Sequence, residues 1–178
     1  YIYSEYMKAA LHDGMYCMPL AFAFPEDNFA RRVEDEVMIG ESLLIAPVYE
    51  QNARGRYVYL PEEMLQVRVK CSESDCIETS VLSAGHHYIP VELDEVVFFV
   101  RKGHILPLAK GGKKIQNVAD VDFADLRLLA YAPDGASYEY YTDDGETKDY
   151  DKLEHFVHIT LDADGNAKSD RATVRAEV

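Results

Sequence analysis

The chain has 178 residues, of which 48% are hydrophobic, so it is long and apolar enough to bury the core of one or two compact units. Its 32 acidic residues against 18 basic ones give a formal net charge of −14, which disfavours nucleic acid as a partner. No apolar stretch reaches the about 18 residues that a membrane helix needs, so we expect no membrane partner. Tyr1 stands in place of an initiator methionine, and we expect the chain to be cut from a longer protein.

Three cysteines, Cys17, Cys71 and Cys76, form neither an even set nor a Cys-x-x-Cys pair, which disfavours a disulfide scaffold and a four-ligand zinc site. We expect reduced thiols, with a bridge between Cys71 and Cys76 across a turn as the alternative in an oxidising setting. No cofactor or metal is expected. The lack of a disulfide framework favours a cytoplasmic protein.

The first two predicted elements are a helix followed by a buried strand, an order that is typical of an α/β barrel. Apolar residues at helical spacing predict a helix with one apolar face, which Gly14 can close in a left-handed conformation. These residues are Tyr3, Tyr6, Met7, Ala10 and Leu11. The nearly continuous apolar run over residues 15–24 then predicts a strand that is buried on both faces in a parallel sheet.

A second helix is predicted to start at Asp27 or Asn28 as its N-cap and to end at Gly40, because Phe29, Val33 and Val37 recur at intervals of four. Within it, residues 34–36 form the acidic cluster Glu-Asp-Glu. Consecutive helix positions point in different directions, so we interpret this cluster as a solvated helix face and not as an acid/base or metal site.

From Ser42 onward the pattern changes to short β-rich runs with no helical period between them, which predicts antiparallel sandwiches. The predicted strands cover residues 43–46, 57–60, 65–71, 87–90, 96–100, 105–108, 126–130, 138–140, 157–159 and 172–176. The charged, glycine-containing segment 110–114 is the expected boundary between two sandwich units. Three Asp-Gly dipeptides suit turns that need positive φ, at positions 134–135, 144–145 and 164–165.

Two motifs resemble metal sites and are interpreted otherwise. His86 and His87 are adjacent, so in a strand they face opposite ways, and no acidic or cysteine partner lies at ligand spacing. Residues 143–146, Asp-Asp-Gly-Glu, lack the alternating acidic positions and distal glutamate of a calcium loop, so we interpret them as a turn.

Tyr138, Tyr140, Tyr141 and Tyr150 leave two interpretations open. They either pack in the core of a sheet, which we favour, or stack sugars in a carbohydrate-binding module. Tyrosine rings that line a solvent-facing groove would support sugar binding, whereas rings interleaved with leucine and valine would argue against it.

Several motifs occur in the order in which they stand in family-31 glycoside hydrolases, the α-glucosidases and α-xylosidases, and the chain resembles the C-terminal part of that family. Residues 38–48, Met-Ile-Gly-Glu-Ser-Leu-Leu-Ile-Ala-Pro-Val, match the entry to the proximal sandwich, and residues 97–108 its late strand pair. Residues 18–20 and 24–27 are similar to the last barrel strand and its exit, and residues 141–147 to a hairpin near the C-terminus. Two departures are Met18, where the family usually has arginine, and Glu62 after Leu-Pro, where it usually has an aromatic residue.

The resemblance implies a mainly β fold, with C-terminal antiparallel β-sandwich domains preceded by the last helix and strand of a (β/α)8 barrel. The implied domains are residues 1–41 as the barrel remnant, 42–112 as the proximal sandwich and 113–178 as a distal β domain. The implied parent is a retaining α-glucosidase that releases terminal α-linked glucose from oligosaccharides with two Asp carboxylates. The family's nucleophile motif contains tryptophan, and this chain has none.

We therefore assign no catalytic, cofactor-binding or metal-binding residue to this chain and expect it to be inactive alone. Its expected partners are the catalytic barrel of the same protein and α-linked oligosaccharide through that barrel, and assembly with a second copy of itself is left open. The alternatives are a carbohydrate-binding β-sandwich module and a purely structural or oligomerisation domain.

Overall fold

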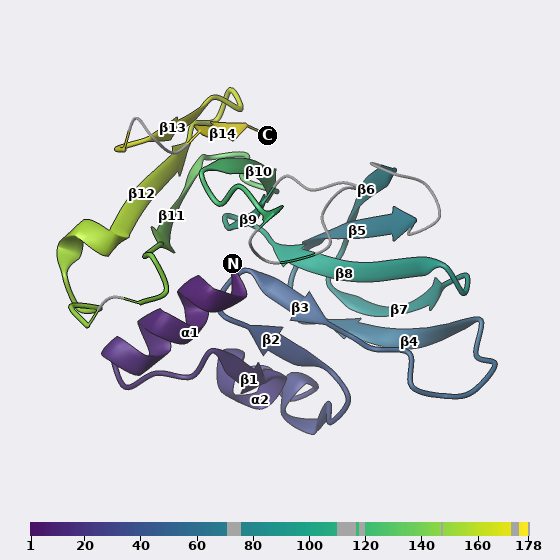
Figure 1. The fold of residues 1–178 in the computed structure, drawn as a ribbon. Helices are drawn as coiled ribbons and strands as arrows, with labels where there is room; N and C mark the ends of the chain where they lie inside the picture. Colours follow the sequence, from purple (N-terminus) through teal and green to yellow (C-terminus); the bar gives the residue numbers. More distant parts are fainter. Residues whose placement is uncertain (71–75, 110–116, 118–119, 147, 172–174, 178) are drawn as a thin grey trace. The chain divides into compact units, whose positions relative to one another are not determined.

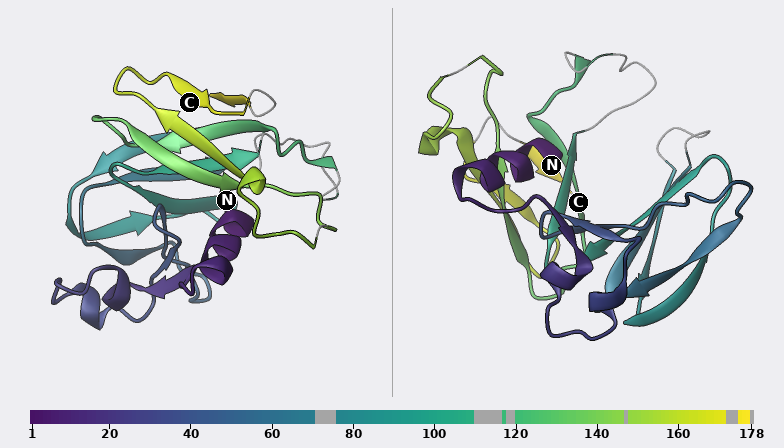
Figure 2. Two further views of the ribbon diagram at one scale, coloured as in Figure 1. Left: turned by 90° about the vertical axis from the view of Figure 1, so that its left-hand side faces the viewer. Right: turned by 90° about the horizontal axis from the view of Figure 1, so that it is seen from below.

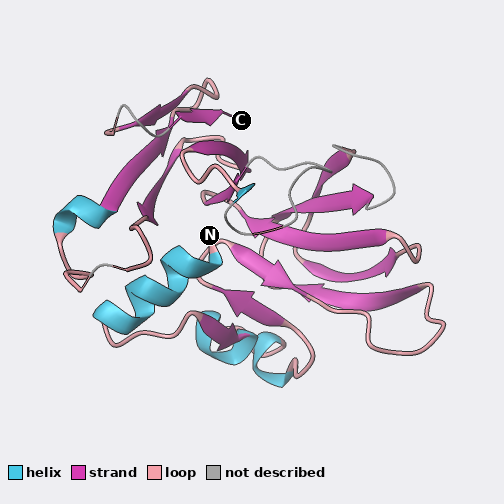
Figure 3. Ribbon diagram, viewed as in Figure 1, coloured by secondary structure: helices cyan, strands magenta, loops and turns pink. Residues whose placement is uncertain are grey.

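The computed structural model describes residues 1–70, 76–109, 117, 120–146, 148–171 and 175–177. They form two compact units. The central unit comprises residues 17–102, and the terminal unit comprises residues 1–16 together with 103–178. Strands dominate both units, and most pairings are antiparallel, which confirms the predicted fold class (Figure 3). In the described part of the chain, no helix has the length and apolar character to cross a membrane.

The central unit contains a six-stranded antiparallel sheet and a two-stranded one (Figure 1). The larger sheet has the order β1-β2-β3-β8-β5-β6, with bounds β1 Cys17–Pro19, β2 Val37–Ile39, β3 Leu43–Ile45, β8 Glu95–Arg101, β5 Met64–Lys70 and β6 Ile77–Leu82. The smaller sheet pairs β4 (Gly55–Leu60) with β7 (Gly85–Pro90).

Side chains from both sheets of the central unit meet in one core. Leu44 and Phe99 come from the larger sheet, and Val58, Leu60 and Ile89 come from the smaller one; all five are buried. Since side chains alternate between the two faces of a strand, burial of Val58 and Leu60 turns Tyr57 and Tyr59 to the outer face of β4. The central unit is thus a sandwich of two sheets.

The strand predicted over residues 15–24 is wrong in length, burial and direction. Only β1 is extended, it pairs antiparallel with β2, and its first residue, Cys17, is exposed. The helical turn α2 (Leu20–Ala23) follows at once, with Leu20 fully buried in the core. Pro19 explains the break because proline has no N–H to continue the ladder.

The second predicted helix is also wrong beyond its first turn. Asp27 does cap it, since its Oδ1 accepts hydrogen bonds from the backbone N–H of Phe29 (2.8 Å) and Ala30 (3.1 Å). The helix is only the 3-10 turn η1 (Ala30–Arg32), after which the chain becomes extended and forms β2. Gly40, with φ 58°, makes the turn between β2 and β3 instead of ending a helix.

Among its described residues, the terminal unit has two three-stranded sheets, the helix α1 and the 3-10 turn η3. One sheet has the order β14-β10-β9, in which β10 (Asp125–Ala130) runs parallel to β14 (Arg175–Glu177) and antiparallel to β9 (Ile105–Ala109). The other is the antiparallel meander β11 (Ala136–Tyr141), β12 (Phe156–Leu161) and β13 (Ala167–Ser169), and η3 (Leu153–His155) precedes β12.

Helix α1 (Ile2–Leu11) lies against β11 of the same unit (Figure 2). Ser4 Oγ accepts a hydrogen bond from the backbone N–H of Tyr141 (3.1 Å), and Tyr138 donates its hydroxyl hydrogen to Glu5 Oε1 (2.7 Å). The predicted apolar face is therefore buried only in part: Met7 of that face is buried, Tyr3 and Tyr6 of it are exposed, and the polar residues Ser4 and Glu5 are buried beside Met7. The residue with positive φ after the helix is Asp13, not Gly14.

The three Asp-Gly dipeptides adopt the predicted positive φ, with Gly135 at 82°, Gly145 at 74° and Gly165 at 84°. Asp164-Gly165 joins the paired strands β12 and β13, and Asp144-Gly145 lies in the longer connection between the paired strands β11 and β12. A Cβ at Gly135 would lie 2.8 Å from the Leu161 carbonyl oxygen, so this turn, between strands of different sheets, requires glycine for space as well as for φ.

The compact units differ from the three segments expected from the sequence. Residues 103–109 belong to the terminal unit because β9 pairs with β10, and residues 1–41 divide between the two units. The expected boundary segment 110–114 lies outside the described residues, as does Cys71 of the possible bridge. The assignment of residues 1–41 to a barrel stays a prediction about the whole protein.

Candidate functional site

The outer face of the β4–β7 ribbon carries five aromatic rings, which we call the aromatic face. Strand register places Tyr57 opposite Tyr88 and Tyr59 opposite His86, with ring centroids 5.2 and 4.9 Å apart. Phe29 from the preceding turn packs edge-on against His86, at 5.6 Å and 89°. Tyr57 is 72% exposed and Tyr88 54% exposed. A contiguous exposed aromatic patch on a strand pair is typical of a binding surface.

Asp27 fixes one end of the aromatic face. Its Oδ2 accepts a 2.6 Å hydrogen bond from the Tyr59 hydroxyl, while Oδ1 caps the η1 turn that carries Phe29. Burial, together with this hydrogen bond, raises the pKa of Tyr59 to about 12, and the hydrogen bond from Tyr59 lowers the pKa of Asp27. The two rings nearest to Asp27 are therefore held in place.

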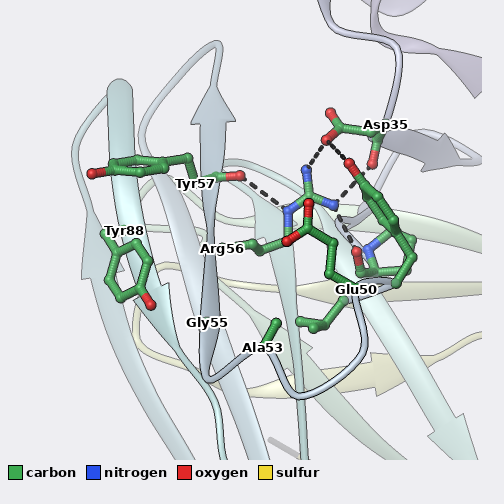
Figure 4. A pocket seen from close by; sticks show the side chains of 10 residues that line it. Asp35, Glu50, Ala53, Gly55, Arg56, Tyr57 and Tyr88 are labelled. Carbon is green, nitrogen blue, oxygen red and sulfur yellow. Dashed lines mark hydrogen bonds and ion pairs between the residues drawn. The ribbon is translucent and has the colours of Figure 1, made fainter.

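Arg56, beside the aromatic face, joins several segments through an ion pair and hydrogen bonds. Its Nη2 lies 2.6 Å from Asp35 Oδ2, and its Nη1 and Nε donate to the carbonyl oxygens of Pro47 (2.7 Å) and Tyr57 (3.0 Å). As Figure 4 shows, the guanidinium points toward Asp35, whereas the rings of Tyr57 and Tyr88 lie on the other side of β4. With its donors committed to the protein, Arg56 positions the loop before β4.

Glu36 is the buried member of the acidic cluster, which corrects the expectation of a solvated helix face. Its side chain is 3% exposed, and its Oε1 accepts the backbone N–H of Tyr59 (2.7 Å). Within the described residues, its Oε2 is buried and has no hydrogen-bond partner. Burial raises the pKa of Glu36 to about 7, against the opposing effects of the Tyr59 hydrogen bond and of Arg56, 3.9 Å away.

Two hollows lie beside Asp35, Tyr49 and Tyr57. One has a volume of about 310 Å³ and is lined by Tyr49, Tyr57, Tyr88, Asp35, Glu50 and Arg56, among others (Figure 4). The second, of about 440 Å³, shares Asp35, Tyr49 and Tyr57 with the first and extends to Glu36 and His86. Both volumes fall in the range of small-ligand pockets.

Gly55 allows Tyr88 to border the first hollow. A Cβ at this position would lie 2.8 Å from the Tyr88 hydroxyl oxygen and 2.5 Å from the Ile89 carbonyl oxygen, and the φ of 153° also favours glycine. None of the residues that line this hollow was predicted from the sequence to form a binding site. The alternation of tyrosine with Val58 and Leu60 was the signal that could have found it, because it fixes which residues face outward.

The arrangement suits binding better than acid/base chemistry. Asp35 is neutralised by Arg56, and Glu36 is too buried to reach a substrate. His86 and His87 do lie on opposite faces of β7, and the Nε2 of His87 is 2.7 Å from the Ser83 carbonyl oxygen. Across the described ranges, no group of three or more His, Cys, Asp or Glu side chains could hold a metal ion.

Three of the four tyrosines proposed as sugar platforms lie in the terminal unit's interior. Tyr138 and Tyr140 pack with Leu126, Leu128 and Val157, which confirms core packing and removes them as stacking surfaces. Burial raises the pKa of both tyrosines. Tyr141 is buried as well, and its hydroxyl contacts Asp143 (3.1 Å) and the carbonyl oxygen of Tyr150 (2.9 Å).

The segment compared with a calcium loop forms the predicted turn. The backbone N–H of Gly145 donates to Asp143 Oδ1 and that of Glu146 donates to Asp144 Oδ1, each at 2.9 Å. Asp143 Oδ2 also accepts the hydroxyl of Tyr3 (2.8 Å), so this turn is attached to α1.

The fold and site define a β-sandwich domain with a surface suited to binding, and comparison with known proteins gives its family. The profile of the glycosyl hydrolase family 31 C-terminal domain matches residues 14–106, just over half of the chain. The chain belongs to glycosyl hydrolase family 31. It corresponds to the C-terminal domain of these enzymes and not to their catalytic barrel.

Curated relatives are much longer than this chain. An alpha-xylosidase of Saccharolobus solfataricus is 32% identical over 149 residues, which cover 82% of this chain and 19% of the relative. Neutral alpha-glucosidase AB of Mus musculus is 31% identical over 146 residues, covering 78% of this chain and 14% of the relative. The chain thus spans a fifth or less of the length of these relatives.

Solved structures share the fold. The GH31 dextranase FjDex31A of Flavobacterium johnsoniae matches 95% of this chain and 20% of its own, with a TM-score of 0.69 and 23% identity. The glucosidase II alpha subunit matches 99% of this chain and 19% of its own, with a TM-score of 0.73 and 18% identity.

Proposed function

We propose that this chain is the C-terminal accessory region of a retaining α-glucosidase, which hydrolyses terminal α-linked glucose from oligosaccharides, and that it braces the catalytic barrel. The observation that carries the proposal is the match to a family-31 C-terminal domain in a chain that spans only a fifth or less of its relatives. Retention requires two carboxylates about 5–5.5 Å apart. We place this pair in the barrel, outside the chain.

Exposed apolar side chains on the first two helices support the bracing role. In the terminal unit, Ile2 and Tyr6 are exposed on α1, and in the central unit Phe22 is exposed on α2. These helices lie in residues 1–41, the segment that the family resemblance predicts to be the end of the barrel. Large apolar side chains at a surface are typical of a contact with another domain, and we propose that the barrel covers them.

Activity measurements test the enzymatic part of the proposal. The intact protein should turn over p-nitrophenyl α-glucoside and release α-glucose as the first anomer seen by proton NMR, since retention preserves the configuration. The 178-residue chain alone should show no turnover. Turnover by this chain, or first release of the β-anomer by the intact protein, would contradict the proposal.

A matched pair of variants tests the bracing role. Phe22→Ser should destabilise the intact protein by about 2–3 kcal/mol, the value of burying one phenylalanine, and should leave the isolated chain unchanged. Leu93→Ser is the control, because Leu93 is fully exposed in the loop before β8. Equal effects of the two substitutions on the intact protein would argue against burial of Phe22 by the barrel.

Two further proposals concern location and assembly. We propose a cytoplasmic location, supported by the free thiols of Cys17 and Cys76, and cell fractionation tests it. Self-association of the isolated chain is the second proposal, supported by the same apolar residues, which are exposed when the barrel is absent, and light scattering of the 178-residue chain tests it.

A further inference from the structure

The aromatic face and the first hollow together form a surface that has ring faces and unused polar atoms side by side. Tyr57 and Tyr88 meet at 68°, so their planes border the hollow from two directions (Figure 4). Tyr49, which is 68% exposed, lines the same hollow. Three exposed tyrosines around one concave surface present apolar ring area that is not used for the core.

Polar atoms at this hollow are available for a ligand. In the part of the chain that the structure describes, neither the hydroxyls of Tyr57 and Tyr88 nor the carboxylate of Glu50 makes a hydrogen bond. A tyrosine hydroxyl both donates and accepts, and a carboxylate accepts. Arg56, in contrast, is committed to Asp35 and to backbone carbonyls.

Charge narrows the ligand class. Asp35 and Glu50 carry two negative charges at the hollow against the single positive charge of Arg56, and the chain as a whole has a net charge of −14. An anionic ligand would be repelled. A purely apolar ligand would leave the free hydroxyls and carboxylate unpaired. A neutral ring with one apolar face and many hydroxyls satisfies both requirements.

We propose that this surface, made by Tyr49, Glu50, Tyr57 and Tyr88, is a binding site for a neutral sugar, in particular a glucosyl unit of an α-linked oligosaccharide. The pyranose C–H face lies on a tyrosine ring, and the sugar hydroxyls bond the Tyr57 and Tyr88 hydroxyls and the Glu50 carboxylate. The choice of α-linked glucose rests on the proposed function, whereas the class of neutral sugar rests on the surface itself. The site holds substrate near the enzyme without taking part in catalysis.

Titration of the 178-residue chain with maltotriose, followed by proton–nitrogen NMR, tests the proposal. We expect a dissociation constant on the order of millimolar, with shifts confined to β4, β7 and the 49–54 loop. Glucuronate at pH 7 should bind at least about tenfold more weakly because of the acidic lining. Absence of shifts at about 50 mM maltotriose, or shifts elsewhere only, would overturn the proposal.

Variants make the test specific. Tyr57→Ala and Tyr88→Ala should each weaken maltotriose binding about tenfold or more, and Tyr57→Phe, which keeps the ring, should weaken it less. Tyr150→Ala in the terminal unit is the matched control, because Tyr150, at 52%, is about as exposed as Tyr88, at 54%. Unchanged binding in Tyr57→Ala, with unchanged circular dichroism, would refute the site.

The two proposals fail separately. If the intact protein hydrolyses α-glucosides but the chain binds no sugar, the site is refuted and the proposed function stands. If the chain binds maltotriose while the intact protein hydrolyses no α-glucoside, the sugar site stands and the proposed function is refuted.

Discussion

Tyrosines in the two units have opposite roles, although both sets occupy alternate positions of a strand. In β11 of the terminal unit, Tyr138 and Tyr140 are 7% and 4% exposed and fill a core. In the central unit, Tyr57 of β4 and Tyr88 of β7 face solvent. The residue type is the same, so the difference comes from which face of the strand the neighbouring residues fill.

The residues that alternate with the tyrosines along the strand determine whether the tyrosines face the core or the solvent. In β11, the tyrosines alternate with Ser137 and Glu139, so the tyrosines are the most apolar residues available for the core. In β4, they alternate with Val58 and Leu60, which fill the core and leave the tyrosines outside. A tyrosine-rich strand therefore indicates a binding face only when its intervening residues are apolar enough to replace tyrosine inside.

The largest difference between the two sets should be in stability. Tyr141→Ala should destabilise the terminal unit by about 3–5 kcal/mol, because it removes a fully buried ring packed on Phe156 and a hydroxyl bonded to Asp143. Tyr57→Ala should change stability by less than about 0.5 kcal/mol. Calorimetry of both variants measures this, and similar losses of stability would break the comparison.

Buried carboxylates extend the comparison. Glu5 in the terminal unit accepts the hydroxyl of Tyr138 and forms an ion pair with Lys8, whereas Glu36 in the central unit has one oxygen without a partner among the described residues. Because the folded pKa of Glu36 lies at about 7, above its ordinary value of 4.5, the folded state keeps a proton that the unfolded chain has lost. Its contribution to stability therefore falls as pH rises from about 4.5 through 7.

Glu36→Gln should remove this pH dependence. The variant should be more stable than the parent chain at pH 8 by on the order of 2–3 kcal/mol and nearly equal to it at pH 4, since the protonated acid and the amide are both neutral. Urea unfolding at the two pH values measures the difference. The same stability difference at both pH values would show that Glu36 does not titrate in the folded state within this range.

A smaller effect is expected from removing one hydroxyl. Tyr138→Phe should cost about 1–2 kcal/mol, because Glu5 loses a 2.7 Å hydrogen bond while its pairing with Lys8 remains. Tyr57→Phe is the matched control and should cost less than about 0.5 kcal/mol, since its hydroxyl is exposed to water. Urea unfolding compares the two, and an equal cost would contradict the assignment of buried and free hydroxyls.

Local patterns predicted the sandwich well because strand alternation depends on neighbours in the sequence. Residues 57–60, 65–70 and 96–100 all lie in strands that the pattern predicted. β6 was missed because its polar Glu78, Thr79 and Ser80 hide the alternation. The strand predicted over residues 15–24 was wrong because a buried strand and a buried helical turn have the same apolar composition.

The site was less predictable because it depends on contacts between distant segments. Glu36 is buried only because β2 pairs with β3 and the backbone of Tyr59 lies beside it. Arg56 pairs with Asp35, which lies 21 positions earlier in the sequence. The outward direction of Tyr57 was available from the sequence, but its pairing with Tyr88 required the register of β4 and β7.

Fluorotyrosine NMR tests the central claim, that one set of tyrosines builds a core and the other a sugar surface, most directly. The 13 tyrosines of the chain are replaced by 3-fluorotyrosine, and maltotriose is added while the fluorine signals are recorded. We predict that the signals of Tyr49, Tyr57 and Tyr88 shift and that those of Tyr138, Tyr140 and Tyr141 do not. Shifts of the buried set, or no shift of the exposed set, would contradict the account.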